Sequence, residues 1–300
     1  MQPINRLPRP ISHRLKTGPK MNLKSTSIVA ALCALVVALG ILPFATFGQT
    51  VTPAQGSRAP QASTAGGTTA GAQTNQQGGM AALPGIDKIL DKYIEASGGR
   101  VAWQKLNSRE SKGVVDVPAM NASGSVEVYE KAPSKVLVTI TISGATFSQG
   151  YDGKVGWSSD PQNGLREQTG DELAETQRDA DFYLPLDMRT MYSKFNVTGT
   201  EDVNGHRAYA VEATPPEGGD PDKLYFATDT GLLVRTISQR HTPDGVFAIQ
   251  EDFSDYRQVE GITVPFQTRT SGQLDFTIRL EEMHHNVAID NAKFEKPAAQ

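Results

Sequence analysis

Residues 169–195, TGDELAETQRDADFYLPLDMRTMYSKF, carry the one helical insertion in a chain that is otherwise a series of β-hairpins. Thr169 and Glu172 have the spacing of a capping box, in which the two side chains satisfy backbone donors of a first helical turn. This spacing predicts a helix over residues 171–183. An insertion of this kind in a β-rich chain suggests a cover for one face of a sheet.

The end of the same stretch predicts a second helix, over residues 186–194. Pro185 suits its first turn, because the missing N–H of proline costs nothing there. Apolar side chains then recur at helical spacing and give the helix one face rich in thioether and aromatic groups: Met188, Met191, Tyr192 and Phe195. Such a face packs permanently against a core or covers a ligand, and both interpretations stay open.

On both sides of the insertion, apolar and polar side chains alternate, as in strands whose two faces meet different surroundings. Residues 274–281 are a clear case, LDFTIRLE. Glycine also stands at four tight turns that require positive φ: Gly153, Gly205, Gly245 and Gly261. The pattern predicts about twelve mostly antiparallel strands, over residues 109–117, 123–130, 135–142, 146–151, 154–159, 196–203, 206–213, 222–228, 232–241, 246–258, 262–270 and 274–286.

A sheet of this length with one apolar face needs a cover on that face. It closes into a barrel, folds into a sandwich, or curls around elements that fill its concave side. The two inserted helices are candidates for this filling, together with a helix predicted over residues 86–96. Incomplete filling would leave an apolar pocket between the helices and the sheet.

Residues 1–48 have the pattern of a leader rather than of a folded domain. Six Lys and Arg residues and no acidic residue precede the apolar run 28–47. We interpret residues 21–48 as a Sec signal peptide with Met21 as the true start, which predicts a periplasmic or secreted protein. The alternative is an uncleaved run 28–47 that anchors the chain in the inner membrane.

Residues 49–82 are almost all Gln, Thr, Ser, Gly, Ala and Pro, which predicts a disordered polar linker. The folded domain is then expected over residues 83–297. The single cysteine, Cys33, lies in the apolar run, so cleavage leaves no cysteine for a disulfide or a nucleophile. It also leaves 23 basic against 33 acidic residues, a net charge of −10 compared with −4 for the whole chain. This balance argues against nucleic acid as a partner.

Several short sequence segments of the predicted domain resemble those of the LolA-like family. This superfamily includes the periplasmic lipoprotein carrier and other outer-membrane lipoprotein-sorting proteins. The segments are ILDKYIEASGG (89–99), SRESKGVVDV (108–117), YDGKVGWSSDP (151–161), DTGLLVR (229–235), DYRQVEGITVPF (255–266) and NVAIDNAKFEKP (286–297). The resemblance implies a mainly β fold with helices, an unclosed antiparallel barrel of 11–12 strands with helices over its concave face. It also implies an apolar cavity for acyl chains.

Trp157 lies in the strand before the helical insertion, where it packs in the core or lines such a cavity. The candidate cavity and lid residues are Trp157, Phe147, Phe182, Met188, Met191, Tyr192, Phe276 and Ile278. No catalytic or cofactor motif occurs, so we predict no catalytic residue, no cofactor and no metal. His284 and His285 are adjacent on a strand and cannot both grip one ion.

Acidic side chains gather on the first inserted helix: Asp171, Glu172, Glu175, Asp179 and Asp181. We interpret them as a solvated face whose first-turn members favour the helix dipole. By the same reasoning Glu251, Asp252 and Asp255 belong to the wet side of the sheet, and His206 and His241 to the surface.

These observations predict an exported, non-enzymatic binding protein that holds lipid or lipoprotein acyl chains in an apolar cavity, with lipoprotein sorting as the process it would serve. An alternative is a tethered cell-envelope sensor or scaffold that binds a protein partner through a strand edge or the helices. A third hypothesis is a hydrolase that uses Asp and His, although no catalytic constellation assembles from the sequence.

Overall fold

A computed structural model describes residues 82–216 and 218–298. The predicted leader, anchor, signal cleavage site and nearly all of the linker lie outside these residues. Among the residues described, no helix is long and apolar enough to cross a membrane.

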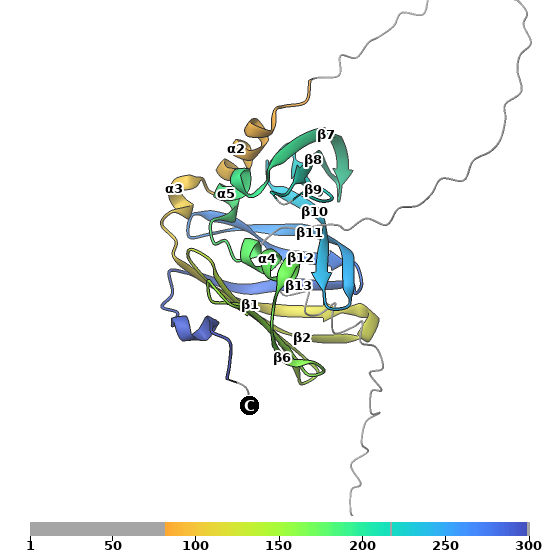
Figure 1. The fold of residues 1–300 in the computed structure, drawn as a ribbon. Helices are drawn as coiled ribbons and strands as arrows, with labels where there is room; N and C mark the ends of the chain where they lie inside the picture. Colours follow the sequence, from red (N-terminus) through yellow and green to blue (C-terminus); the bar gives the residue numbers. More distant parts are fainter. Residues whose placement is uncertain (1–81, 217, 299–300) are drawn as a thin grey trace, which may run out of the picture.

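Thirteen strands form one antiparallel sheet in the order β6-β5-β4-β3-β2-β1-β13-β12-β11-β10-β9-β8-β7 (Figure 1). The strands are β1 (Ser108–Val117), β2 (Ala122–Lys131), β3 (Lys135–Ile142), β4 (Ala145–Tyr151), β5 (Gly156–Asp160), β6 (Gly164–Glu167), β7 (Lys194–Val203), β8 (His206–Thr214), β9 (Asp222–Ala227), β10 (Leu233–Thr242), β11 (Gly245–Val259), β12 (Ile262–Ser271) and β13 (Phe276–His285). Because β6 and β7 are the two ends of this order, the sheet is unclosed. The predicted fold class, a mainly β fold with helices over an open antiparallel sheet, is confirmed.

The helices of the described residues are α2 (Ile86–Ala96), α3 (Arg100–Trp103), α4 (Gly170–Asp179) and α5 (Leu184–Met191), with 3-10 turns η2 (Pro118–Met120) and η3 (Asn291–Phe294). The positions of α4 and α5 in the chain explain the helical insertion. They follow β6 and precede β7, so they carry the chain from one edge of the open sheet to the other. In Figure 1 the sheet curls around them.

Most predicted strands agree with the structure to within about two residues, and the four turn glycines have positive φ as predicted. Four local predictions were wrong. The structure adds a short strand, β6, that the sequence analysis omitted. The predicted capping box is absent, because Thr169 makes no side-chain cap and Glu172 instead accepts hydrogen bonds from Arg166 at 2.7 and 2.5 Å. The first helix ends at Asp179 rather than at residue 183. The second helix ends at Met191 rather than at residue 194, so Phe195 belongs to β7.

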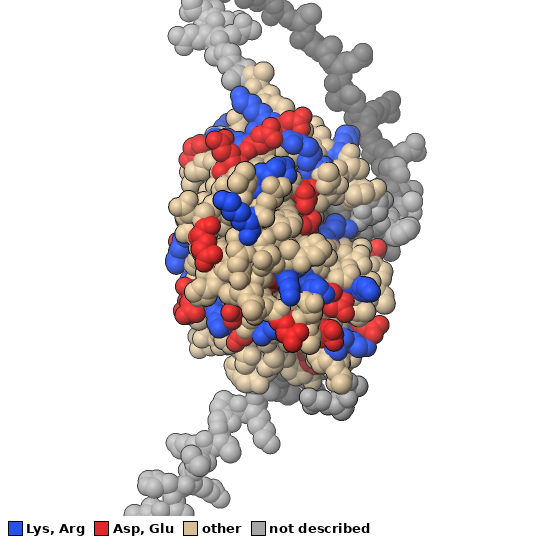
Figure 2. Space-filling model, turned by 90° about the vertical axis from the view of Figure 1, so that its left-hand side faces the viewer, with Lys and Arg blue, Asp and Glu red and all other residues tan. Residues whose placement is uncertain are grey.

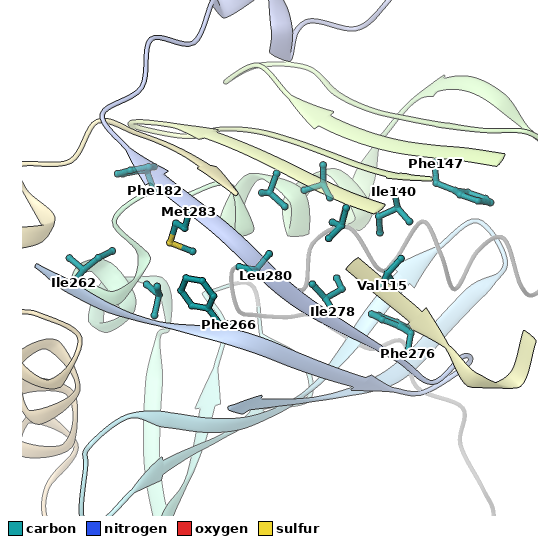
Figure 3. Packing of buried hydrophobic residues seen from close by; sticks show 14 of the residues in the cluster. Val115, Ile140, Phe147, Phe182, Ile262, Phe266, Phe276, Ile278, Leu280 and Met283 are labelled. Carbon is teal, nitrogen blue, oxygen red and sulfur yellow. The ribbon is translucent and has the colours of Figure 1, made fainter. Parts of the chain in front are cut away.

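The concave face of the sheet carries two large hydrophobic clusters. The first cluster lies over β1–β4, β12 and β13 and includes Val115, Ile140, Phe276 and Ile278 (Figure 3). The second lies over β8–β11 and is completed by side chains of α2 and α5. The α4–α5 segment joins them, since Phe182 and Leu186 belong to the first cluster while Leu184, Met188 and Tyr192 belong to the second.

Polar contacts attach these helices at their outer ends. Arg189 of α5 lies 2.9 Å from Asp87 and 3.3 Å from Asp91, both in α2. Lys and Arg side chains intermix with Asp and Glu over the face seen in Figure 2, which is the left-hand side of Figure 1. That face therefore carries no large field of one sign.

Candidate ligand-binding cavity

A cavity lies between the sheet, the α2–α3 region and the segment that joins α4 to α5. It has a volume of about 80 Å³, and the whole recess, including the part open to solvent, holds about 820 Å³. Its lining is mostly apolar and consists of Tyr93, Ser97, Trp103, Arg109, Ser111, Val128, Glu130, Asp179, Asp181, Phe182, Leu184, Pro185, Phe253, Tyr256, Thr263, Val264, Pro265, Thr268, Leu280 and Met283.

A hydrogen bond and a ring contact position the aromatic side chains in the helical wall of this cavity. The indole nitrogen of Trp103 donates to the backbone oxygen and the hydroxyl of Ser97, both at 3.2 Å. The ring of Tyr93 packs edge-on against Phe226 with 5.4 Å between the ring centroids. Aromatic side chains fixed in this way keep apolar surface next to the cavity.

One wall carries a paired charge on the sheet. Arg109 of β1 donates from Nε and Nη2 to the two carboxylate oxygens of Glu130 on β2, at 2.5 Å each. The same guanidinium lies 5.9 Å from the centroid of the Phe182 ring. Both donors that face Glu130 are therefore engaged, and the pair presents little net charge to the cavity.

At the C-terminal end of α4 the lining becomes part of a buried charged network. Nη1 of Arg240 on β10 donates to Oδ2 of Asp179 at 2.8 Å, and each side chain is 4% exposed. One turn earlier, Glu175 accepts from the backbone N–H of His241 at 3.2 Å and lies 2.7 Å from its Nδ1. Glu251 of β11 is 1% exposed and lies near the same guanidinium.

Burial dominates the titration of this network. It raises the pKa of Asp179 well above its ordinary value, although Arg240 opposes the shift. Burial likewise raises the pKa of Glu175, and it raises that of Glu251 to about 7. The cause is that ionised carboxylates are poorly solvated in a protein interior.

A second polar link fastens the helical segment to the sheet. The hydroxyl of Tyr192 donates to Oδ2 of Asp222 on β9 at 2.9 Å, and burial raises the pKa of that carboxyl well above its ordinary value. On the other side, Nε2 of Gln149 on β4 donates to the hydroxyl of Thr176 at 2.9 Å. The segment is thus fixed to strands on both halves of the open sheet.

The structure brings only one of the eight predicted cavity residues, Phe182, into the lining of this cavity. Phe147, Phe276 and Ile278 lie in the first hydrophobic cluster (Figure 3). Met188 and Tyr192 are buried in the second cluster, and Met191 is half-buried against it. At Met188, therefore, α5 packs on the core in this structure.

Trp157 lies away from the cavity lining. Its indole nitrogen donates to the backbone oxygen of Phe294 in η3 at 2.9 Å, and its side chain is buried. Residues near the C-terminal end of the described chain therefore cover Trp157. Of the two roles considered for it, the contacts show packing.

Three interpretations of charged residues were wrong. Glu175 and Asp179 are buried rather than on a solvated face, and Glu251 is buried rather than on the wet side of the sheet. His241 is paired with Glu175 instead of standing free at the surface. His285 is also buried, and burial lowers its pKa to about 4.

Arg240 was missed altogether by the sequence analysis. The alternation of side chains along the strands indicates this burial. Glu251 is on the same strand face as the buried Ile249 and Phe253, and Arg240 is on the same face as the buried Thr236 and Ser238. Within residues 82–216 and 218–298, no three His, Cys, Asp or Glu side chains come together in a way that could hold a metal ion.

No protein-family model matches this sequence, and no curated protein matches it. Among solved structures, the chain is similar to a DUF1329 family protein from Desulfovibrio piger, with 17% identity over 72% of this chain and 99% of that one and a TM-score of 0.49. It is also similar to a putative outer membrane lipoprotein-sorting protein domain from Vibrio parahaemolyticus, with 11% identity over 70% of this chain and 95% of that one and a TM-score of 0.45.

A LolA superfamily protein from Nitrosomonas europaea is also similar, with 13% identity over 70% of this chain and 97% of that one and a TM-score of 0.44.

Proposed function

We propose that this protein is an exported, non-enzymatic binding protein that holds the acyl chain of a lipid or lipoprotein in the cavity beneath α2 and the α4–α5 segment. The observation that carries the proposal is the mostly apolar recess between helices and sheet. Ligand pockets typically have apolar walls with few polar groups. Export rests on the leader pattern of residues 21–48.

The cavity has a volume of about 80 Å³, which is much smaller than the roughly 300–1,000 Å³ of typical ligand pockets. A long acyl chain would therefore lie partly in the open mouth or displace the 180–183 connection between α4 and α5. The ends of this segment stay fixed by Arg240 and Asp222, so the short connection is the part expected to move. Each buried methylene would contribute about 0.8 kcal/mol to binding.

The proposal is tested with the mature chain, purified without detergent, by titration with the fluorescent apolar probe 1-N-phenylnaphthylamine and by mass spectrometry of its organic extract. Saturable probe binding, displaced by C10 to C16 alkyl compounds, and co-purified acyl species are the expected results. Met283→Trp fills the cavity wall and should weaken probe binding at least tenfold. Val246→Trp, at an exposed site, is the matched control.

A thermal melt checks that both variants are folded. Equal probe binding by the unmodified protein and Met283→Trp would contradict the proposal, as would an extract free of acyl species combined with no probe binding.

A second candidate function, an envelope scaffold that binds a protein partner, is favoured by the sheet edge at β7. This ten-residue strand ends the sheet and pairs with β8 on one side. Free strand edges are sites at which another chain can add a strand. A photo-cross-linker at Thr200 on β7 should capture one stoichiometric protein that survives delipidation, whereas one at Thr139, in the interior of the sheet, should not.

A further inference from the structure

A second cavity lies between α2, β8 and the turn after β9, and we call it the α2–β9 cavity. Its volume is about 240 Å³, compared with about 80 Å³ for the cavity beneath the α4–α5 segment. The two cavities share no lining residue. The proposed acyl-chain site therefore leaves the larger space without a role.

The floor of the α2–β9 cavity is apolar. Ile89 of α2 and Phe226 of β9 are buried members of the second hydrophobic cluster, and both line the cavity. Tyr209 of β8 is half-buried against the same cluster, and Pro84 adds an apolar wall just before α2. A ligand therefore needs an apolar part, because a polar one would lose its hydration on this floor without gaining hydrogen bonds.

Lys92 of α2 closes one side of the cavity. Its Nζ donates to the backbone oxygens of Thr228 and Asp229 at 2.7 Å each. Its stem crosses Gly231, where an added Cβ would lie 2.7 Å from Cγ of the lysine. Gly231 also has a positive φ of 82°, so the close approach and the backbone conformation both require glycine. The lysine stem and the turn after β9 thus form one wall.

The only charged side chains among the lining residues are two lysines, Lys88 and Lys92. Lys88 is exposed and lies one helical turn before Lys92, so the two ammonium groups belong to the same side of α2. Within the described part of the chain, the Lys88 ammonium makes no hydrogen bond or ion pair. Lys92 uses two of its three ammonium donors on backbone oxygens.

Acidic side chains close to these lysines in the fold do not line the cavity. Asp87 and Asp91 lie 2.9 and 3.3 Å from Arg189 of α5. Asp229 interacts electrostatically with the second lysine, but its carboxylate is 66% exposed. Glu95, in the last turn of α2, is exposed as well. An anion inside the cavity would therefore meet positive charge at its walls.

We propose that the α2–β9 cavity binds a small anionic amphiphile, whose apolar part lies against Ile89 and Phe226 while its anionic group pairs with Lys88. Charge complementarity with the two lysines carries the inference. An amphiphile with an ammonium group would bring a third cation to the same wall and is disfavoured. Because this site is separate from the acyl-chain cavity, the inference goes beyond the proposed function and holds or fails independently of it.

The experiment titrates the ¹⁵N-labelled mature protein at pH 7 with octanoate, octanol and octylammonium, which share one chain length. Octanoate is expected to shift the amide signals of residues 228–231 and to bind there about fivefold more tightly than octylammonium, or better. The amide signals of residues 180–184 report separately on the acyl-chain cavity. An absence of octanoate shifts at 228–231, or equal affinities of octanoate and octylammonium there, would overturn the inference.

A charge reversal tests the role of Lys88. Lys88→Glu should weaken octanoate binding at residues 228–231 by about tenfold or more and leave octanol binding unchanged. Lys105→Glu, at an exposed site after α3 and outside the lining, is the matched control and should leave both affinities unchanged. Equal weakening of octanoate binding by the two variants would reveal an effect of net charge alone and would overturn the inference.

The amide spectrum of each variant also shows whether it is folded. If Lys88→Glu does not fold, the comparison of octanoate with octylammonium on the unmodified protein decides the question. Shifts by octanoate at residues 180–184 without shifts at 228–231 would support the acyl-chain cavity and overturn the second site, so the two proposals are told apart in one titration.

Discussion

Glu251 lies in the buried network beneath α4, and its removal should change how the stability of the protein depends on pH. We consider Glu251→Gln, which keeps the shape of the side chain. Burial raises the pKa of this carboxyl from 4.5 to about 7, more than Arg240 lowers it. The folded protein therefore holds a proton at Glu251 between about pH 4.5 and pH 7, whereas the unfolded chain does not.

The sign and the size of the effect follow from this difference in bound protons. Where the folded state binds more protons than the unfolded state, the free energy of unfolding falls as the pH rises. With about 1.36 kcal/mol for each pH unit, ionised Glu251 costs the folded protein about 3 kcal/mol above pH 7. This cost disappears as the pH falls toward 4.5.

Glu251→Gln removes that pH-dependent cost. Its amide N–H would be buried at the position of Oε1 without an acceptor, which costs about 1–3 kcal/mol at every pH. A stability change measured at a single pH therefore cannot separate the cost of the ionised carboxylate from the cost of the buried amide. The expected result is that the free-energy difference between variant and unmodified protein moves by about 3 kcal/mol in favour of the variant from pH 4.5 to pH 8.

Urea unfolding followed by tryptophan fluorescence gives this difference at each pH, since the chain has two tryptophans and both are buried. Glu281→Gln, on the exposed side of β13, is the matched control and should give a curve parallel to that of the unmodified protein. Parallel curves for Glu251→Gln and the unmodified protein would refute the argument that Glu251 is buried as a costly charge.

Two further substitutions test the packing of the helical segment and the position of Trp157. Met188→Ala should lower the free energy of unfolding by about 2–5 kcal/mol, because the parent side chain is 1% exposed in the second cluster. Met191→Ala, at a half-buried position of the same helix, should cost clearly less in the same urea titration, and equal losses would contradict permanent packing at Met188. Trp157→Phe removes the hydrogen bond to Phe294 and should cost about 1–3 kcal/mol. It should leave 1-N-phenylnaphthylamine affinity unchanged, and a shift in that affinity would place Trp157 in the binding site.

The local patterns that the sequence predicted well are those set by neighbours in the chain. Alternation in β12 and β13 and positive φ at Gly205 and Gly261 arise within a few residues, so the hairpins could be predicted. β6 escaped prediction because GLRE has no apolar alternation and pairs with β5 at the edge of the sheet. The missing cap at Thr169 has a similar cause, since Arg166 competes for Glu172.

The charged network could not be predicted from local pattern. Glu175 and Asp179 are four residues apart on one face of α4, which is typical of a solvated acidic stripe. That face is buried because Arg240 stands opposite, 61 residues later in the chain. A buried carboxyl group depends on its partner, and only the folded chain brings the partner near.

The sequence by itself determined that this chain is a long antiparallel sheet with an apolar face, a helical insertion able to cover it, and an acidic balance that argues against nucleic acid. Tertiary structure decided the rest of the 169–195 segment. It placed α4 and α5 between the two edges of the open sheet, buried Met188 in the core and turned Asp179 toward both Arg240 and the cavity. The physical reason is that the spacing of hydrophobic residues along a strand or helix is a local property. Burial and charge pairing instead depend on contacts between residues far apart in the chain.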